Sequence, residues 1–188
     1  MQLDEAIETR RSVKDYSIKK PDWRDIIECI DAARYAPMAG NIFSLKFILV
    51  NDKEKIQKIA NACEQDFVNQ SHYLVIVCSD AKLTKNSFEE RAEKYLRQQA
   101  GAAIQNFLLK LQEKKLVTCW VGYFVDEMIK KELKIPKDIE VEAIFPIAYA
   151  SGKKYLAPGK KEKIEMDRIL FFNKYGNKRM KPTKTLNA

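Results

Sequence analysis

The stretch Thr9-Arg10-Arg11-Ser12-Val13-Lys14-Asp15-Tyr16 holds three cations and a hydroxyl within five successive residues. It directly follows Leu3–Glu8, in which the apolar residues recur at helical spacing. This spacing predicts a first helix that ends near Arg10. The cations would therefore be displayed by a short connecting segment just beyond a helix end.

An extended backbone in this segment would send alternate side chains to opposite sides. Arg10, Ser12 and Lys14 would share one side. Arg11 and Val13 would share the other. A guanidinium fork, an ammonium and a hydroxyl are the groups that bind a phosphate monoester. Such clusters also occur in solvated loops, so a phosphate site is one of two interpretations.

The composition fits one folded unit with a basic end. The chain has 188 residues, of which 46% are hydrophobic, enough for a single domain with a substantial core. The net charge is +8, but the residues after Asp167 carry six cations and no acid, which leaves +2 for the rest. We therefore predict a folded domain at 1–172 and a basic C-terminal tail at 173–188. Nucleic-acid binding through the tail is an alternative, although the balanced body argues against an extended footprint.

The cysteine and histidine content limits the possible chemistry. The four cysteines are far apart and form no CxxC pair, which is typical of reduced thiols in a cytoplasmic protein. They are Cys29, Cys63, Cys78 and Cys119. His72 is the only histidine, so a multi-histidine metal site is excluded. The sequence has neither an apolar run of ~20 residues nor a signal-peptide pattern, so we expect a cytoplasmic protein with no membrane partner.

Helical and strand periods alternate along the chain. Apolar residues spaced by threes and fours indicate helices, and continuous apolar runs indicate buried strands. Pro146 lies within the last run and favours a sheet edge or a bulge there. Helices are expected from Asp22 to before Ala36, at Lys53–Phe67, Ser87–Lys115 and Asp126–Leu133, and strands at Leu45–Val50, Tyr73–Cys78, Leu116–Val121 and Glu142–Ala150. This order predicts an α/β or α+β fold in three layers.

Two of the expected helices have further features. Asp22 is a plausible N-cap for the second helix. The residues of that helix at core spacing are Trp23, Ile26, Ile27, Ile30 and Ala33. The helix from Ser87 to Lys115 would be ~40 Å long, about the diameter of the domain. Its small residues at 100–103 would allow another backbone to approach, so it fits a central core helix or a two-fold dimer interface.

Few side chains are available for acid–base or nucleophilic catalysis. The chain has no GxGxxG or GxxxxGK(S/T) loop, so ordinary dinucleotide and P-loop sites lack support. His72 adjoins an apolar run, as a strand-edge residue would. These observations favour chemistry that is carried by a cofactor, and we expect no catalytic side chain.

Three motifs together resemble those of the FMN-dependent nitroreductase family. They are the Arg10–Lys14 start, the Ala36–Asn41 loop and the Thr118–Gly122 strand end, in the family's order over about residues 3–170. The resemblance implies an α+β fold, a three-layer sandwich with a mixed central β-sheet flanked by helices. It also implies a homodimer with FMN at the subunit interface and NADH or NADPH as the hydride donor. The acceptor would be a nitroaromatic, a quinone or a similar small molecule.

The resemblance also assigns roles in cofactor binding. The phosphate and ribityl contacts would be Arg10, Arg11, Ser12 and Lys14, with the late basic pair Lys160 and Lys161. A loop covering the flavin of the other subunit would contain Pro37, Met38, Ala39 and Asn41. The flavin ring would lie against Val121 and Gly122, with the Gly122 N–H available to its N5 atom. Gln65 would lie near the pyrimidine edge.

The loop departs from the family's usual pattern. Met38 replaces a hydroxyl, and Phe43, Ser44 and Leu45 replace Gln, Pro and Trp. We expect a more apolar pocket, so reductive dehalogenation or flavin destruction are alternatives to nitroreduction. Because one flavin face would be open, the nicotinamide and the acceptor would enter in turn. This arrangement predicts a ping-pong mechanism.

Overall fold

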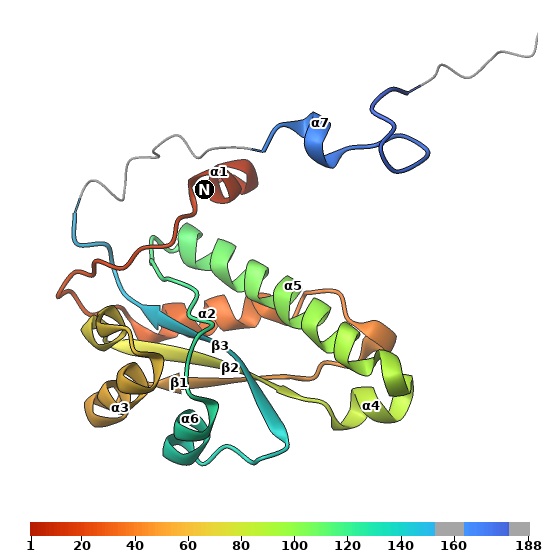
Figure 1. Ribbon diagram of the computed structural model, residues 1–188. Coiled ribbons are helices and arrows are strands. Elements are labelled where there is room, and N and C mark those ends of the chain that lie inside the picture. The colour runs from red at the N-terminus through yellow and green to blue at the C-terminus, as the bar shows by residue number, and fades with distance from the viewer. Residues whose placement is uncertain (153–163, 181–188) are drawn as a thin grey trace, which may run out of the picture. The chain divides into compact units, whose positions relative to one another are not determined.

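The computed structural model describes residues 1–152 and 164–180, which belong to two separate compact units, Met1–Ala157 and Pro158–Ala188. Figure 1 shows the elements of both. The helices of the first unit are α1 (Leu3–Thr9), α2 (Trp23–Ala33), α3 (Lys53–Cys63), α4 (Lys82–Phe88), α5 (Ala92–Glu113) and α6 (Asp126–Leu133). Its strands are β1 (Leu45–Val50), β2 (Tyr73–Asp80) and β3 (Ile139–Ile147). Short 3₁₀ turns are η1 (Ala39–Asn41), η2 (Asp66–Gln70) and η3 (Glu89–Arg91).

The three strands form one sheet in the order β1-β2-β3. Both pairings are antiparallel, with Leu49 opposite Val75 and Val75 opposite Phe145. Within the described residues, parallel pairing is confined to the single bridge between Ser12 and Thr118. The mixed character that was expected of the sheet therefore rests on this bridge alone.

Alternate side chains of the sheet enter two separate cores. Val75 and Phe145 pack with α2 and α5 on one face, and Ile76 and Ile144 pack with α3 and α6 on the other. Figure 1 shows the same arrangement, with the sheet between the two pairs of helices. Apolar residues on both faces of β2 explain why its sequence is a continuous apolar run. The three-layer α+β architecture is confirmed.

The second helix differs from expectation on its outer side. Asp22 caps α2 as predicted, because its carboxylate accepts a hydrogen bond from the Arg24 N–H at 2.9 Å. Ile26 is buried. Trp23 and Ile27, which were expected in the core, are 44% and 47% exposed. α2 thus has more apolar side chains than the rest of this chain buries.

The expected long helix is interrupted. It is divided into α4, η3 and α5, and the break falls where Glu89 adopts a φ of 46°. The Phe88 ring packs edge-on against Tyr95, with the ring centroids 5.1 Å apart. Ala100 and Ala103 lie inside the core of the chain, while Gly101 is exposed. The interpretation of this segment as a central core helix is therefore confirmed for Ala100 and Ala103.

The segment from 116 to 121 is not a regular strand. It forms isolated bridges, Val121 with Ile144 of β3 and Val117 with Ala148, the residue directly after β3. Residues 144, 146 and 148 of an extended chain direct their N–H groups to one side, and proline has none. Pro146 thus interrupts the pairing between the two bridges, as expected for proline at a sheet edge.

A β-bulge places one carboxylate at the start of β3. Val77 pairs with Ala143 and Cys78 with Val141, so Glu142 is the extra residue. Its side chain, 7% exposed, accepts hydrogen bonds from Ser79 Oγ at 2.5 Å and Arg97 Nη1 at 2.6 Å. This ion pair fastens the β2–β3 hairpin to α5.

In the second unit, the described residues include one short helix, α7 (Met166–Ile169). The rings of Phe171 and Tyr175 lie 4.8 Å apart, and Lys178 pairs with Asp167 at 3.3 Å. No helix among the described residues of either unit is long and apolar enough to cross a bilayer.

Candidate functional site

The segment that carries the predicted phosphate ligands is fixed at both ends. Val13 is buried, and its N–H donates to the Thr118 carbonyl at 2.9 Å. Tyr16 bridges to Ala150, and the Ser17 N–H donates to the Tyr149 carbonyl at 2.8 Å. Val13 is buried between the exposed Ser12 and Lys14, as the predicted alternation requires, whereas Asp15 is exposed and Tyr16 is buried. The alternation is therefore confirmed only as far as Lys14.

The cations of this segment have different surroundings. Arg11 Nη1 donates to the carbonyls of Glu8 at 2.6 Å and Arg10 at 3.0 Å, so the Arg11 side chain caps the C-terminal end of α1. Within the described part of the chain, Arg10 makes no ion pair. The Lys14 ammonium lies 4.9 Å from the centre of the Phe67 ring. Arg10 and Lys14 thus keep their charge available for an anion.

The backbone at Gly122 is open. Val121 is buried and pairs with Ile144, while Gly122 is exposed, and its N–H has no partner among residues 1–152 and 164–180. A Cβ at Gly122 would meet only the Trp120 ring, whose indole nitrogen would be nearest at 3.9 Å. Packing within the described chain therefore does not require glycine here. A ligand that approaches the backbone closely would require it.

Two buried hydroxyls lie at the same junction and have no hydrogen-bond partner among the residues that the structure describes. They are Tyr16 Oη and Thr118 Oγ1, on the two segments that the Ser12–Thr118 bridge joins. Burial raises the pKa of the Tyr16 phenol well above its usual value, and the nearby Cys119 adds to the shift. A buried hydroxyl without a partner is costly, so these groups mark an unusual point of the fold.

The loop at 37–41 has a backbone that few residues adopt. Gly40 and Asn41 have φ values of 56° and 57°. Gln99 of α5 holds the end of the loop, because its amide donates to the Ile42 carbonyl at 2.8 Å and accepts from the Ser44 N–H at 2.9 Å. The Ser44 hydroxyl also pairs with Thr84 Oγ1 at 2.6 Å. The loop is therefore shaped by contacts within the chain.

These contacts correct one expectation about the pocket. Ser44 and Leu45 are buried inside the chain, and Phe43 packs against the core. They consequently do not line an open pocket within this chain. The replacement of Gln, Pro and Trp at these positions therefore affects the packing of the chain, not the polarity of a pocket. Met38 and Ala39 remain partly exposed and line a cavity of about 300 Å³ beside Tyr95.

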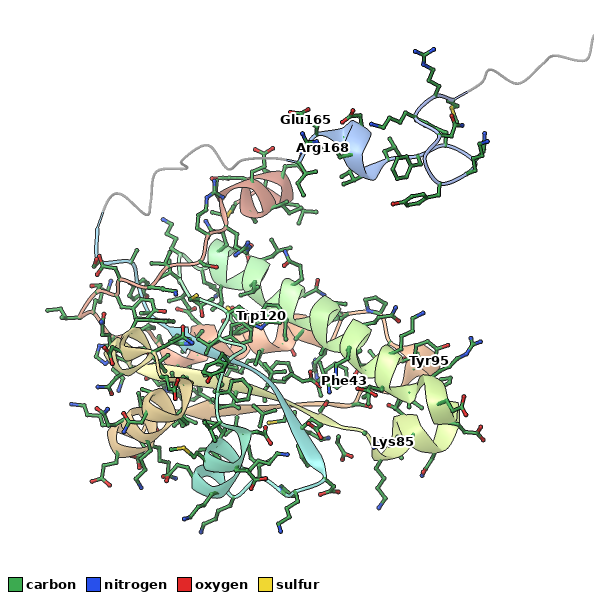
Figure 2. All side chains as sticks on the ribbon, viewed as in Figure 1. Phe43, Lys85, Tyr95, Trp120, Glu165 and Arg168 are labelled. Carbon is green, nitrogen blue, oxygen red and sulfur yellow. The ribbon has the colours of Figure 1, made fainter. Side chains whose placement is uncertain are left out.

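One chain brings some predicted ligands together and separates others. The loop at 37–41 lies against α5 near Gln99, whereas Thr9 accepts a hydrogen bond from Gln112 at 3.0 Å. These two residues of α5 are ~20 Å apart along the helix axis. Figure 2 shows Tyr95 near the α4 end of α5 and Trp120 nearer the middle of the sheet. Segment 10–14 thus adjoins Thr118, in the segment that leads to Val121 and Gly122, while the loop at 37–41 lies against the other end of α5.

The remaining predicted residues are Gln65, Lys160 and Lys161. Gln65 precedes η2, and its amide donates to the Cys63 carbonyl at 3.5 Å. It lines a polar cavity of about 530 Å³ between α3 and η2. Lys160 and Lys161 lie outside the described residues.

Comparison with known protein families assigns this chain to one of them. The sequence profile described as "Nitroreductase family" matches residues 7–81 and 61–149. This chain belongs to the nitroreductase family.

Related sequences extend over most of the chain. A protein of Archaeoglobus fulgidus, provisionally named NADH dehydrogenase/NAD(P)H nitroreductase, is 30% identical over 153 residues, covering 79% of this chain and 85% of its own length. Iodotyrosine deiodinase from Thermotoga neapolitana is 23% identical over 180 residues, covering 81% of this chain and 90% of its own. Sequences with different named activities therefore resemble this chain.

Solved structures share the fold. A nitroreductase family protein from Clostridium novyi NT superposes with a TM-score of 0.75 at 26% identity, over 94% of this chain and 96% of its own. The FMN-dependent nitroreductase from Clostridium difficile R20291 gives a TM-score of 0.73 at 22% identity, over 92% and 99%. The nitroreductase fold of this chain is thus established along nearly its whole length.

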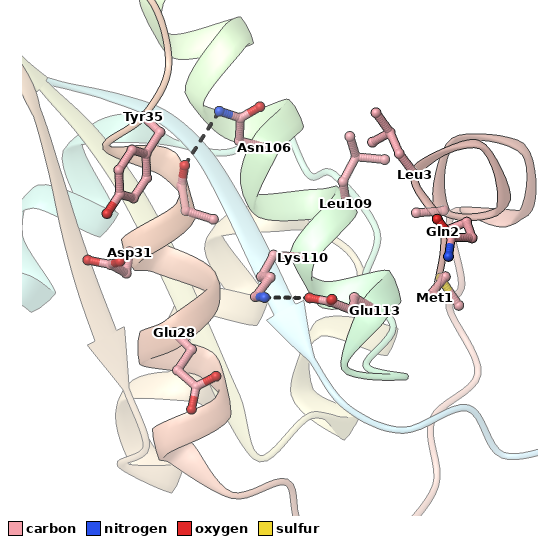
Figure 3. A pocket seen from close by; sticks show the side chains of 12 residues that line it. Met1, Gln2, Leu3, Glu28, Asp31, Tyr35, Asn106, Leu109, Lys110 and Glu113 are labelled. Atoms are coloured by element: carbon pink, nitrogen blue, oxygen red, sulfur yellow. Dashed lines mark hydrogen bonds and ion pairs between the residues drawn. The ribbon is translucent and has the colours of Figure 1, made fainter.

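Two features of this family member were not foreseen from the sequence. One is the contact of Phe67 with Lys14, which joins residues far apart in the chain. Phe67 was expected at the end of a helix, but α3 ends at Cys63 and Phe67 lies in η2. A groove of about 490 Å³ lies between α1, α2 and α5, as Figure 3 shows. Its lining includes Leu3, Tyr35 and Leu109. Phe67 is flanked by Asp66 and Val68, and this local pattern gives no signal of the contact with Lys14, which depends on the fold.

Proposed function

We propose that this chain binds FMN and oxidises NADH or NADPH, with the electrons passing to a small acceptor. The observation that carries the proposal is the anchored segment at 10–14, which the Ser12–Thr118 bridge joins to the segment that leads to the open backbone at Gly122. The family match and the FMN-dependent name of the C. difficile structure support flavin as the cofactor.

The donor set at this segment fits FMN. FMN, when bound, supplies two-electron redox chemistry between a nicotinamide and an acceptor. Arg10 offers a guanidinium fork, Ser12 a hydroxyl and Lys14 an ammonium to a phosphate. The Gly122 N–H is a donor for a ring atom that gains negative charge, and a positioned donor of this kind stabilises such charge.

The other proposed ligands have secondary roles. The phosphate and pyrimidine contacts are completed by Arg11, Gln65, Lys160 and Lys161. Because Arg11 already donates to the end of α1, its contribution to the phosphate would be mainly through its charge. No side-chain nucleophile is needed, so the role of the protein is to bind FMN, to orient it and to screen it from water.

A homodimer is part of the proposal because, in one chain, the loop at 37–41 and the segment that begins at Thr9 adjoin residues of α5 that are ~20 Å apart along the helix axis. Large apolar side chains are exposed on the helices beside the groove of Figure 3, as is unusual for a monomer. They are Leu3 and Ile7 on α1 and Trp23 and Ile27 on α2. A second copy that covers this face would bring its own loop at 37–41 to the Lys14 segment.

The proposed order of binding is ping-pong, with the nicotinamide and the acceptor using one opening in turn. Double-reciprocal plots should then be parallel, and each substrate at high concentration should inhibit competitively against the other. Intersecting lines would indicate separate openings and contradict this order while leaving the cofactor assignment unaffected.

Reductive dehalogenation is the second candidate, favoured by the similarity to iodotyrosine deiodinase. The same flavin-loaded preparation should be offered iodotyrosine, a nitroaromatic and a quinone, with iodide release and NAD(P)H consumption both measured. Iodide release that outpaces reduction of the other two acceptors would establish the second candidate over the first.

The phosphate assignment is tested by Arg10→Ala. Loss of a charge-assisted pair should weaken FMN by about 1.5–3 kcal/mol, measured by fluorescence titration. Lys58→Ala is the control, because Lys58 is an exposed cation on α3 that pairs with Glu132 of α6 at 3.1 Å, outside the proposed site and the proposed dimer face. Equal FMN affinity in wild type and Arg10→Ala would remove the cluster from the site.

A further inference from the structure

The cavity beside Tyr95 lies between the loop at 37–41 and α5 and has a volume of about 300 Å³. Residues 37–39 line it on the loop side. Tyr95, Gln98, Gln99 and Ala102 line it on the α5 side. This volume is close to the smallest that small-molecule sites usually have, so a molecule bound here would have to be small.

The residues that line this cavity, among those that the structure describes, include no charged side chain. Lys94 lies one turn before Gln98 on α5 but is not part of the lining. Arg97 adjoins Gln98 in the sequence, and its guanidinium is paired with Glu142 at 2.6 Å. An ionised group that enters the cavity would therefore lose hydration without gaining an opposite charge, which is costly. The lining thus favours an uncharged molecule.

The cavity offers one side-chain amide to a bound molecule. The Gln99 amide is already used, because it donates to the Ile42 carbonyl and accepts from the Ser44 N–H. Gln98 is exposed, and its amide makes no hydrogen bond to residues 1–152 or 164–180. Its NH₂ group can donate to the oxygen of a quinone or of a nitro group.

We propose that this cavity binds the electron acceptor and selects uncharged aromatic acceptors, quinones or nitroaromatics, over ionised ones. The inference rests on the proposed FMN function and dimer, in which the loop at 37–41 covers the flavin of the partner subunit and so brings the cavity beside it. Tyr95, Met38 and Ala102 pack on the ring of the acceptor, and Gln98 donates to its oxygen. Iodotyrosine, which carries an ammonium and a carboxylate, is then a poor acceptor.

The reaction at this site is balanced by the nicotinamide and water. NADH or NADPH supplies two electrons and one proton, and water supplies the second proton. A quinone leaves as its hydroquinone, and a nitro group leaves as a nitroso group with release of one water molecule.

The first experiment uses the wild-type full chain loaded with FMN and needs no variant. It compares para-nitrobenzamide with para-nitrobenzoate, which have nearly the same shape and differ in charge. NAD(P)H consumption gives kcat/KM for each acceptor, and each value is divided by the rate constant for reduction by free reduced riboflavin, which corrects for intrinsic reactivity. We expect a corrected kcat/KM at least about tenfold higher for the amide, because the carboxylate would be desolvated without a partner. Equal values, or a preference for the carboxylate, would overturn the inference.

The second experiment changes the charge of the cavity. Gln98→Lys should lower the preference for the amide by about two- to fivefold, as expected for an exposed charge pair with the carboxylate. Gln57→Lys is the matched control, because Gln57 is an exposed glutamine of α3, which packs on the opposite face of the sheet from α5. This control should keep the wild-type preference. An unchanged preference in Gln98→Lys would overturn the inference.

Gln98→Leu separates the acceptor from the flavin. Loss of one hydrogen bond should raise KM for para-nitrobenzamide by about two- to tenfold and leave the affinity for FMN, measured by fluorescence titration, unchanged. A loss of FMN affinity with an unchanged KM would mean that the flavin occupies this cavity, and would overturn the inference while leaving the proposed function intact. A wild type that binds no FMN, or that binds it and reduces neither quinones nor nitroaromatics, would overturn both.

Discussion

Gly40→Ala should destabilise the protein through the loop at 37–41. The φ of Gly40 is 56°, and a left-handed backbone costs a residue with a Cβ about 1–2 kcal/mol. The added Cβ would also lie 2.8 Å from Cζ of Phe88, closer than real contacts. Displacing that ring should cost about 1–2 kcal/mol more. The sum, about 2–4 kcal/mol, corresponds to a fall in Tm of about 4–16 °C.

The assay is thermal and urea unfolding of wild type, Gly40→Ala and a control, Gly152→Ala. Gly152 has no positive φ, and its Cβ would meet nothing within 4 Å, so the control should be near neutral. In a Phe88→Ala background, Gly40→Ala should cost about 1–2 kcal/mol less, because the steric part is gone. Equal stability of Gly40→Ala and Gly152→Ala would refute the reasoning.

Three further predictions concern assembly, the β-bulge and the thiols. Gly101→Glu, at an exposed site where a Cβ meets nothing, should leave the chain folded but monomeric by light scattering, whereas Ala103→Glu, inside the core, should unfold it in circular dichroism. Glu142→Gln should lower the free energy of unfolding by about 1–2 kcal/mol in urea titration, since the charge-assisted bond from Arg97 is lost. Burial, opposed by Lys114 and Lys110, raises the pKa of Cys29 from 9.0 to about 12. The neutral thiol thus stabilises the fold below pH 9, and this contribution is lost as the pH rises toward 12. At pH 8, roughly one unit below the ordinary pKa, Cys29 should react with a thiol reagent only after denaturation, and rapid native labelling would contradict its burial.

Local sequence patterns predicted the regular elements well. β1 and α6 have the expected bounds, because a continuous apolar run and an amphipathic stretch that stops before Pro136 are complete local signals. The failures depend on distant contacts. The break before α5 accompanies the packing of Phe88 on Gly40 and Tyr95, and α3 ends early because Glu64 takes a left-handed backbone. Neither is visible in a helical period.

The candidate site was predictable to a similar extent. Alternation in an extended segment correctly placed Val13 inside and Lys14 outside, since it depends only on backbone geometry. The sequence could not indicate that Leu45 is buried within the chain or that Phe67 meets Lys14, because both depend on which segments become neighbours. The roles of Gly122 and of the loop stay predictions.

The most direct test of the account is light scattering combined with flavin absorbance on the purified protein after addition of excess FMN. The account predicts a dimer that elutes with one FMN per chain. A monomer saturated with FMN, or a dimer that takes up no flavin, would contradict it.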